Sequence, residues 1–382
     1  MNNWPIYKIQ DICEIKSGKR IPLGFDFVIK ETQHPYIRAR DIKNGRINTD
    51  DLIYLDDSTF VKIKKYIIEE NDIAITIVGA SIGDIGFATK EVNGFNLTEN
   101  AVRLTNFKDN VSSQYLFYLL VQNQYKEFMQ TIAGGAAQPK LGIYKIQRIK
   151  VQLPPLPTQQ KIASILSAYD NLIQNYKKQI EALQTAASEL YKEWFVRFRF
   201  PGYQTTKFEN GIPKGWKIEK LTKLVEVKYG KDHSKLDVGN IPVYGSGGIM
   251  RYCNKSLYDK ETVLIPRKGS LNNIMYANNP LWTVDTMFYT VMLRKNIAKY
   301  LYYVLSKIDM ESFNAGAALP SMTTEILSHF KIIVPDNEIL ESFDKKIALI
   351  FTQIDNLQQQ ITNLTQQRDL LLPRLMSGKL EV

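Results

Sequence analysis

The chain has 382 residues, which is enough for two or three domains, and its 44% content of hydrophobic residues excludes a disordered protein. Its net charge of +10 favours a polyanionic partner, either nucleic acid or anionic lipid. No run of 18 apolar residues and no signal-peptide pattern is found, and two isolated cysteines indicate a reducing cytoplasm, so a membrane or disulfide-framed protein is not expected.

The first segment, residues 1–155, mixes the patterns of strands and helices. Residues 72–78 form a β-rich run that ends at a glycine, and residues 145–153 alternate apolar and polar side chains; both patterns predict strands. Residues 112–130 place apolar side chains three and four positions apart, which predicts a helix. We therefore expect a compact α+β domain.

A long helix is predicted next, from Thr158 as N-cap to Arg199. Its apolar side chains are spaced alternately by four and three positions, which is the heptad pattern of a coiled coil. At 1.5 Å per residue this helix would extend about 63 Å. Such a helix is too long to bury its apolar face against one small domain, so we expect it to pack against another helix.

The rest of the chain repeats this order. A second mixed segment covers residues 201–335, and a second heptad-patterned helix is predicted from Asn337 to Lys379, with Gly378 at its end. The matching positions are Trp4 and Trp216, Gly18 and Gly230, Tyr115 and Tyr300, Pro154 and Pro335, and Ile162 and Ile347. The spacing between matched residues differs in the mixed segments and agrees in the helices.

This order predicts two mixed α/β domains separated by two long helices that pack as an antiparallel coiled coil, with pseudo-two-fold symmetry. DNA half-sites read from one face are related in the same way, with centres about 34–36 Å apart. The predicted boundaries are 1–155 and 201–335 for the two domains, and 156–200 and 336–382 for the two helical regions.

Catalytic motifs are missing from the sequence. It contains no phosphate-binding GxxxxGK[ST] loop and no Asn/Asp-Pro-Pro-aromatic motif of adenine methyltransferases. The glycine-rich run at 245–248 lacks the spacing of a dinucleotide-binding loop and predicts a tight turn instead. Carboxylates at 336 and 344 lie at the start of a predicted helix, which disfavours a nuclease site. The three histidines have no partner at metal-ligand spacing.

Basic and polar residues gather in the glycine-containing turns of both mixed segments. Glycine lets a backbone approach its ligand closely, lysine and arginine neutralise phosphates, and arginine and glutamine can read base edges. The candidate DNA-binding residues are Lys16, Lys19, Arg20, Arg38, Arg40, Gln138, Lys140, Lys231, Ser246, Arg251, Arg267, Lys268 and Ser270. No catalytic residue and no metal ligand is assigned.

Several motifs of the chain resemble those of the specificity (S) subunits of type I restriction-modification systems. They are LPPLPTQQKI at 153–162, LYKEWFVRFRFPG at 190–202, IPRKGS at 265–270 with LWTVDT at 281–286, and LLPRLMSGKL at 371–380. The second helix opens with Pro335-Asp336-Asn337-Glu338 and so departs from the proline-rich opening of the first. The resemblance covers essentially the whole chain.

The resemblance implies two target recognition domains, each reading one half of a split DNA sequence, and helical regions that dock two modification (methyltransferase) subunits. It also implies two motor-nuclease subunits, with S-adenosylmethionine, ATP and magnesium belonging to the partner subunits and no cofactor in this chain. The expected protein is therefore a non-catalytic, cytoplasmic DNA-recognition subunit. Two alternatives remain open: a self-sufficient DNA methyltransferase or nuclease with an unfamiliar site, and a coiled-coil scaffold that does not bind nucleic acid.

Overall fold

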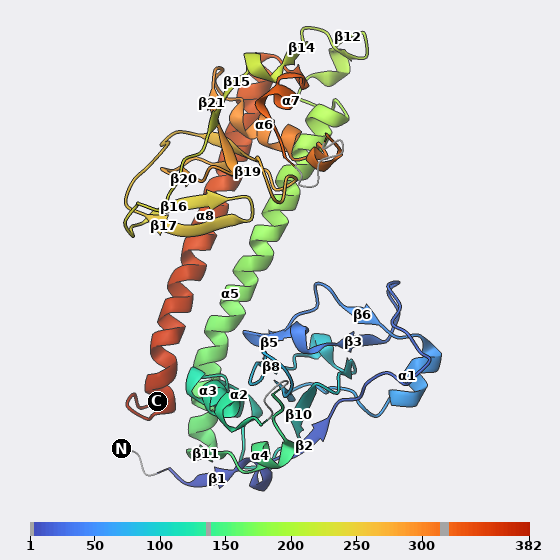
Figure 1. Cartoon of the computed structure of the whole chain (residues 1–382), viewed down its shortest axis with the longest axis vertical. Helices are drawn as coiled ribbons and strands as arrows, with labels where there is room; N and C mark the ends of the chain where they lie inside the picture. Colours follow the sequence, from blue (N-terminus) through green and yellow to red (C-terminus); the bar gives the residue numbers. More distant parts are fainter. Residues whose placement is uncertain (1–3, 135–138, 314–320) are drawn as a thin grey trace. The chain divides into compact units, whose positions relative to one another are not determined.

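The fold was analysed in a computed structural model that describes residues 4–134, 139–313 and 321–382 (Figure 1). The chain divides into two compact units. Unit 1 comprises residues 1–175 and 361–382, and unit 2 comprises residues 176–360. Within the described ranges, no helix combines the length and the apolar composition that a membrane span requires.

Among the described residues of unit 1, the strands form two sheets and one strand pair. The larger sheet has the order β2 (Glu14–Ser17), β10 (Ala101–Thr105), β7 (Ile73–Thr76), β8 (Ile85–Phe87), β5 (Gly45–Ile47) and β4 (Ile42–Lys43). The smaller sheet has the order β6 (Ile53–Tyr54), β3 (Pro35–Ile37) and β9 (Asn96–Leu97). Strand β1 (Ile6–Lys8) pairs antiparallel with β11 (Lys150–Gln152), which ties the start of the unit to the strand that precedes the first long helix.

The described part of unit 1 contains the helices α1 (Asp57–Ile63), α2 (Ser113–Leu120), α3 (Asn123–Ile132) and α4 (Ile143–Gln147), the first half of α5 (Leu156–Tyr191) and the end of α8 (Asn337–Met376). Two predictions for this region were wrong in detail. The helix predicted over 112–130 is broken at Gln122, whose backbone is extended and whose side chain donates to the carbonyl of Leu119, in the last turn of α2. The strand predicted over 145–153 begins only at Lys150, because Ile146 and Ile149 are buried three positions apart on a helical turn.

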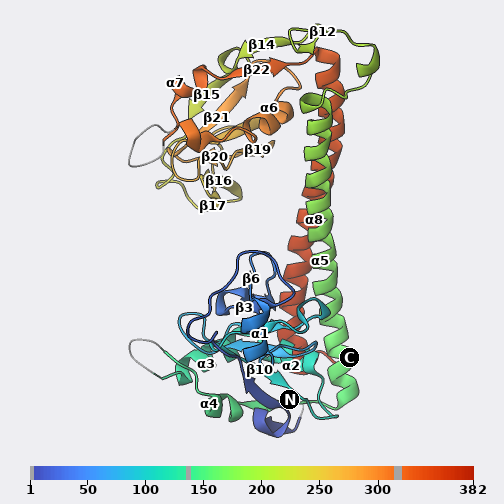
Figure 2. The ribbon, with the colours of Figure 1, turned by 90° about the vertical axis from the view of Figure 1, so that its right-hand side faces the viewer.

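Unit 2 repeats the order of the first four strands of the main sheet of unit 1 and of the three strands of its second sheet, and the described residues hold no counterpart of β5 and β4 in it. Figure 2 shows both units from the side. Its main sheet has the order β15 (Val225–Tyr229), β21 (Met287–Met292), β18 (Thr262–Pro266) and β19 (Met275–Ala277), and its second sheet β17 (Gly248–Cys253), β16 (Ile241–Gly245) and β20 (Trp282–Thr283). In both units the second sheet holds one parallel pair, β3 with β9 and β16 with β20. Strand β14 (Lys217–Lys220) pairs with β22 (Lys331–Val334), as β1 does with β11. The turn predicted at 245–248 joins β16 to β17.

The described part of unit 2 also contains the strand pair β12 (Phe208–Glu209) and β13 (Ile212–Pro213), helix α6 (Ala298–Leu305) and helix α7 (Thr324–Ser328). Helix α8 (Asn337–Met376) begins in this unit and ends in unit 1. An aromatic cluster joins its first turns to the end of α5, with the Phe195 ring centroid 4.8 Å from that of Phe343 and 4.7 Å from that of Tyr300.

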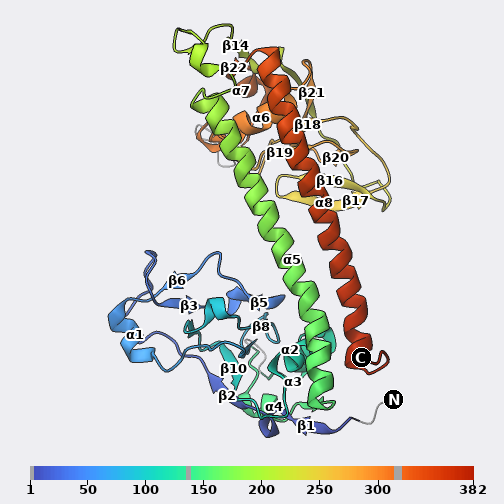
Figure 3. The same cartoon turned by 180° about the vertical axis from the view of Figure 1, so that it is seen from behind.

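The two long helices run antiparallel in each unit. In unit 1, Ile162 and Leu166 of α5 share a buried cluster with Leu375 of α8. Figure 3 shows the start of α5 beside the end of α8, near the C-terminus. In unit 2, the end of α5 shares a cluster with Phe343 and Ile347, near the start of α8. The buried residues follow the heptad positions, which confirms the predicted coiled-coil pattern.

The predicted ends of the first helix were wrong. Helix α5 begins at Leu156, and Thr158 lies in its first turn, where the backbone N–H groups of Thr158 and Gln159 reach the carbonyl of Pro155. Pro157 is tolerated in this turn because its missing N–H would have no partner there. At the other end, α5 passes into a π-helical turn at Lys192–Val196 instead of continuing to Arg199. Its 36 residues extend about 54 Å.

Candidate nucleic-acid interface

A glycine followed by a lysine leaves the first strand of the main sheet in each unit. In unit 1, the N–H of Gly18 donates to Ala101 O at 3.1 Å and the N–H of Lys19 to Leu97 O at 2.8 Å. A Cβ on Gly18 would lie 2.0 Å from the carbonyl oxygen of Thr98. Only glycine fits so close to another backbone, so this position fixes the strand end against the 97–101 loop.

The same arrangement recurs in unit 2. The N–H of Gly230 donates to Met287 O at 2.9 Å and the N–H of Lys231 to Thr283 O at 2.8 Å. A Cβ on Gly230 would lie 2.0 Å from Val284 O. The match between Gly18 and Gly230, which the sequence predicted from spacing, is therefore a match of backbone contacts.

At the same end of each main sheet, a further strand end is hydrogen-bonded to two neighbouring loops. In unit 1 the N–H of Ile77 donates to Asn100 O at 2.8 Å, and the carbonyl of Ile77 accepts from the N–H of Leu141 at 2.9 Å. In unit 2 the N–H of Arg267 donates to Thr286 O at 2.8 Å, and its carbonyl accepts from the N–H of Met322 at 2.9 Å. Ile77 and Arg267 thus occupy equivalent places.

We call the converging segments the tips. The tip of unit 1 comprises 18–20, 77–79, 98–100 and 139–141, and the tip of unit 2 comprises 230–231, 267–270, 284–286 and 321–322. Six basic residues that were predicted from the sequence lie in the tips: Lys19, Arg20 and Lys140 in unit 1, and Lys231, Arg267 and Lys268 in unit 2. Ser270 belongs to the second tip, and Ser246 adjoins it, because a Cβ on Gly269 would lie 2.5 Å from Ser246 Oγ.

Three arginines of unit 1 share one cavity of about 480 Å³ beside the tip: Arg20, Arg38 and Arg40. Each arginine forms an ion pair with a carboxylate. Arg20 Nε donates to Glu99 at 2.7 Å, Arg38 pairs with Asp41 at 2.9 Å, and Arg40 Nη2 lies 2.5 Å from Asp51. Arg20 and Arg40 keep most of their side-chain surface exposed, whereas Arg38 is largely covered.

The acids give this cavity a mixed character. Burial alone would raise the pKa of Glu99, but the hydrogen bond from Arg20 holds it below its ordinary value. The hydroxyl of Tyr36, on the same wall, donates to Lys19 O at 2.9 Å, and burial raises its pKa to about 12. The cavity therefore offers both donors and acceptors, which is what reading the edge of a base requires.

In unit 2, the Arg267 guanidinium lies 5.3 Å from the ring centroid of Tyr229 and donates to Asp285 O at 3.3 Å. The stacking and the hydrogen bond orient a cationic fork at the tip, beside the exposed Lys268. Arginine held in this way is suited to bidentate contacts with a base or a phosphate.

Two predicted residues, Lys16 and Arg251, lie away from the tips. Lys16 lies within β2 and pairs with Glu14 at 3.1 Å. The Arg251 guanidinium donates to the carbonyls of His233 and Leu236, both at 2.7 Å, and so holds a loop of unit 2. Gln138 lies outside the described residues.

Three residues of these surfaces were not predicted from the sequence. Glu99 and Asn100 line the arginine cavity, and Asn273 donates from its side chain to Ser246 O at 2.8 Å. The only sequence signal for the first two was the match between the 98–100 and 284–286 segments, which is too short to detect without the strand pairing. Across the described residues, no group of three His, Cys, Asp or Glu side chains could hold a metal ion.

Comparison with known sequences identifies one family. The model of the family described as "Type I restriction modification DNA specificity domain" matches residues 1–185 and 213–370 of this chain. The two matched segments cover most of both units.

Individual relatives agree with this match over nearly their full lengths. The chain is 28% identical to the type I restriction enzyme MjaIX specificity subunit of Methanocaldococcus jannaschii, over 100% of this chain and 94% of that protein. It is 20% identical to the type I restriction enzyme HindI specificity subunit of Haemophilus influenzae, with 100% of both chains covered. Among solved structures, the type I restriction-modification S subunit from M. genitalium shares the fold, with a TM-score of 0.66 at 19% identity over 98% of this chain and 97% of that one.

Proposed function

This chain belongs to the type I restriction-modification DNA specificity family, and on that premise we propose that it is the subunit that reads a split DNA target, one half with each tip. The observation that carries the proposal is the pair of equivalent tips with different side chains. The backbone contacts at Gly18 and Gly230 are the same, yet Ile77 and Val78 in unit 1 correspond to Arg267 and Lys268 in unit 2.

A constant frame with variable side chains is the arrangement expected of two readers with different targets. Arg267, stacked and hydrogen-bonded, can donate two hydrogen bonds to one guanine edge, which is worth about 1–3 kcal/mol of discrimination. The exposed Lys19, Lys140, Lys231 and Lys268 are suited to phosphate contacts, which supply affinity without sequence information. Binding should therefore weaken steeply with rising salt.

The finer division of labour is also proposed. Residues 1–155 and 201–335 act as the two target recognition domains, and residues 156–200 and 336–382 are the helical regions that set the spacer and dock two modification subunits. S-adenosylmethionine, ATP and magnesium act in the modification subunits and in two motor-nuclease subunits, which assemble with this chain in the cytoplasm. The chain itself carries out no catalysis.

The direct test is to produce the chain together with its modification subunit in cells that lack other adenine methylation, and to map methylated adenines by single-molecule sequencing. The proposal predicts one motif made of two defined halves around a gap of fixed length. A contiguous motif, or methylation that does not depend on this chain, would refute it. The purified chain alone should neither methylate nor cut DNA when all three cofactors are added; activity there would make it a self-sufficient enzyme.

A further inference from the structure

A charged residue interrupts the apolar seam of α8 in unit 1, and the chain satisfies it internally. Arg368 Nη1 on α8 lies 2.5 Å from Asp170 Oδ1 on α5, and the hydroxyl of Tyr118 on α2 donates to Asp170 Oδ2 at 2.6 Å. Both members of the ion pair keep only about a quarter of their side-chain surface exposed. Carboxylate, guanidinium and tyrosine thus form one cluster between the helices.

Unit 2 repeats the acid and the tyrosine of this cluster but not the arginine. Asp355 follows Asp170 by 185 positions, the interval that also separates Tyr303 from Tyr118, and each aspartate is followed by Asn-Leu. The residue 185 positions before Arg368 is Leu183. In the described parts of the chain, no basic side chain pairs with Asp355.

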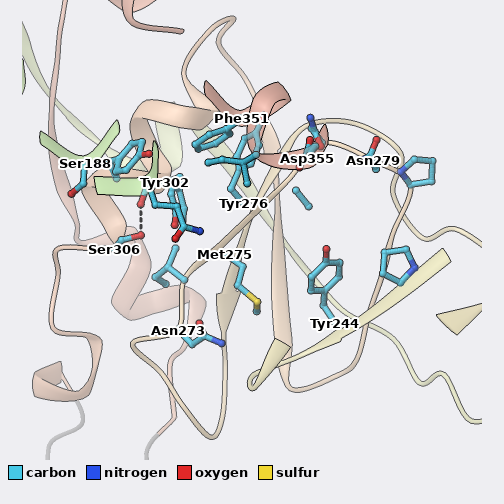
Figure 4. A pocket seen from close by; sticks show the side chains of 18 of the residues that line it. Ser188, Tyr244, Asn273, Met275, Tyr276, Asn279, Tyr302, Ser306, Phe351 and Asp355 are labelled. Atoms are coloured by element: carbon cyan, nitrogen blue, oxygen red, sulfur yellow. Dashed lines mark hydrogen bonds between the residues drawn. The ribbon is translucent and has the colours of Figure 1, made fainter. Parts of the chain in front are cut away.

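Asp355 instead faces a cavity of about 920 Å³ (Figure 4). Its walls come from α5 (Gln184, Ser188), from β16, from the 273–280 segment that includes β19, from α6 and its last turn (Tyr302, Ser306), and from α8 (Phe351, Asp355). This volume is at the upper end of that of small-ligand sites, so it has room for a long side chain and its neighbours.

The lining favours a delocalised cation. The rings of Tyr244, Tyr276, Tyr302 and Phe351 all lie on the wall, and aromatic faces attract a guanidinium. Burial raises the pKa of Asp355, and the same carboxylate adds to the effect of burial in raising the pKa of Tyr244. The carboxylate therefore faces the aromatic wall without a counter-charge. The one basic residue of the wall, Lys307, follows α6 and is exposed.

We propose that the Asp355 pocket of unit 2 binds the guanidinium of an arginine presented by a partner protein chain, in the place that Arg368 occupies in unit 1. In the occupied cluster of unit 1, a guanidinium pairs with the aspartate that also accepts from the tyrosine hydroxyl. The choice of the modification subunit as the partner rests on the proposed function, whereas the arginine site itself does not.

The first test uses N-acetyl-arginine amide as the probe and the full chain labelled with 3-fluorotyrosine. Fluorine resonances of Tyr244 and Tyr276 are assigned with Tyr→Phe variants and followed by NMR as the probe is added. A saturable shift is expected, with at least tenfold weaker binding of the citrulline analogue, which has nearly the same shape and no charge. No saturable shift, or equal binding of the two probes, would overturn the proposal.

Variants then locate the site. Asp355→Asn should weaken binding of the probe at least tenfold. Asp259 is an exposed acid of the same unit, and Asp259→Asn should leave binding of the probe unchanged. Leu183→Arg supplies the missing arginine from within the chain and should also abolish probe binding, whereas Leu183→Met should not. Circular dichroism checks that each variant is folded. If Leu183→Arg does not fold, Asp355→Asn alone decides the question. Unchanged binding to Asp355→Asn would contradict the assignment.

The second test measures binding of the purified modification subunit to the same variants. Asp355→Asn should weaken it at least tenfold and Asp259→Asn should not. If the probe depends on Asp355 but the modification subunit binds both variants equally, the partner arginine is refuted while the proposed function stands. If the unmodified chain does not bind the modification subunit at all, the proposed function fails instead.

Discussion

Alanine at Gly18 should destroy recognition of one half-site and spare the other. The added Cβ would lie 2.0 Å from Thr98 O and 2.3 Å from Leu97 O, where real Cβ atoms essentially never come within 3.0 Å. Both contacts are backbone atoms, so no side chain can rotate away. The strand end and the 97–101 loop must separate by about 1 Å, the difference between 2.0 and 3.0 Å.

The substitution should destabilise the tip of unit 1 strongly without unfolding the unit. Overpacking of this kind costs about 1–3 kcal/mol, and the hydrogen bonds from Gly18 and Lys19 to the loop are worth about 1 kcal/mol each. The sum, about 3–5 kcal/mol, is below the roughly 5–15 kcal/mol that stabilises a typical domain, so unit 1 should fold with a displaced tip. Losing one bidentate base contact at that tip would weaken specific binding roughly 5- to 150-fold.

The assay compares binding to a full target with binding to targets that have one half scrambled. In Gly18→Ala, scrambling the half read by unit 1 should no longer matter, while scrambling the other half should still weaken binding. Gly230→Ala should give the mirror result. Gly247→Ala is the matched control, because nothing lies within 4 Å of its Cβ position. Equal loss of discrimination at both halves in either tip variant would refute the reasoning.

Three further outcomes are expected. Arg103→Met should lower the free energy of unfolding by about 3–5 kcal/mol in denaturant titrations, because it leaves Asp72, 3% exposed and 2.6 Å from the guanidinium, buried without its counter-charge; a change below 1 kcal/mol would contradict this. Lys268→Ala should reduce the slope of log K against log salt by about 1 without changing the sequence preference, and an altered preference would show a base contact instead. Burial raises the pKa of Cys13 to about 12, so its thiol should resist iodoacetamide at pH 8 in the folded chain. Since the folded pKa lies above the unfolded value of about 9, stability should fall as pH rises from about 9 toward 12.

The architecture was predictable because the sequence patterns of its two long helices extend over many residues. Heptads over some forty residues define a helix pair whatever the surroundings, and the buried positions Ile162, Leu166 and Leu375 follow them. The start of the first helix was not predictable, because Thr158 satisfies the rules for an N-cap while Pro157 fits equally well inside the first turn. At the break, the extended backbone of Gln122 and its side-chain hydrogen bond to Leu119 O are features that no spacing pattern records.

The candidate site was predictable only in part. Glycine-lysine turns such as Gly18-Lys19 and Gly230-Lys231 stand out in the sequence, and both reach a tip. Arg251 is also a basic residue close to a glycine-containing turn, but its guanidinium donates hydrogen bonds to the carbonyls of a neighbouring loop. Charge alone cannot distinguish these roles, because the distinction depends on which backbone carbonyls the fold brings within reach.

Exchange of one recognition domain tests the account most directly. Residues 1–155 are replaced by the corresponding domain of a relative with a different target, and methylated adenines are mapped in cells that contain the hybrid and its modification subunit. The account predicts that one half of the motif changes, while the other half and the length of the gap stay the same. A change in both halves, or in neither, would contradict the claim that each unit reads its own half.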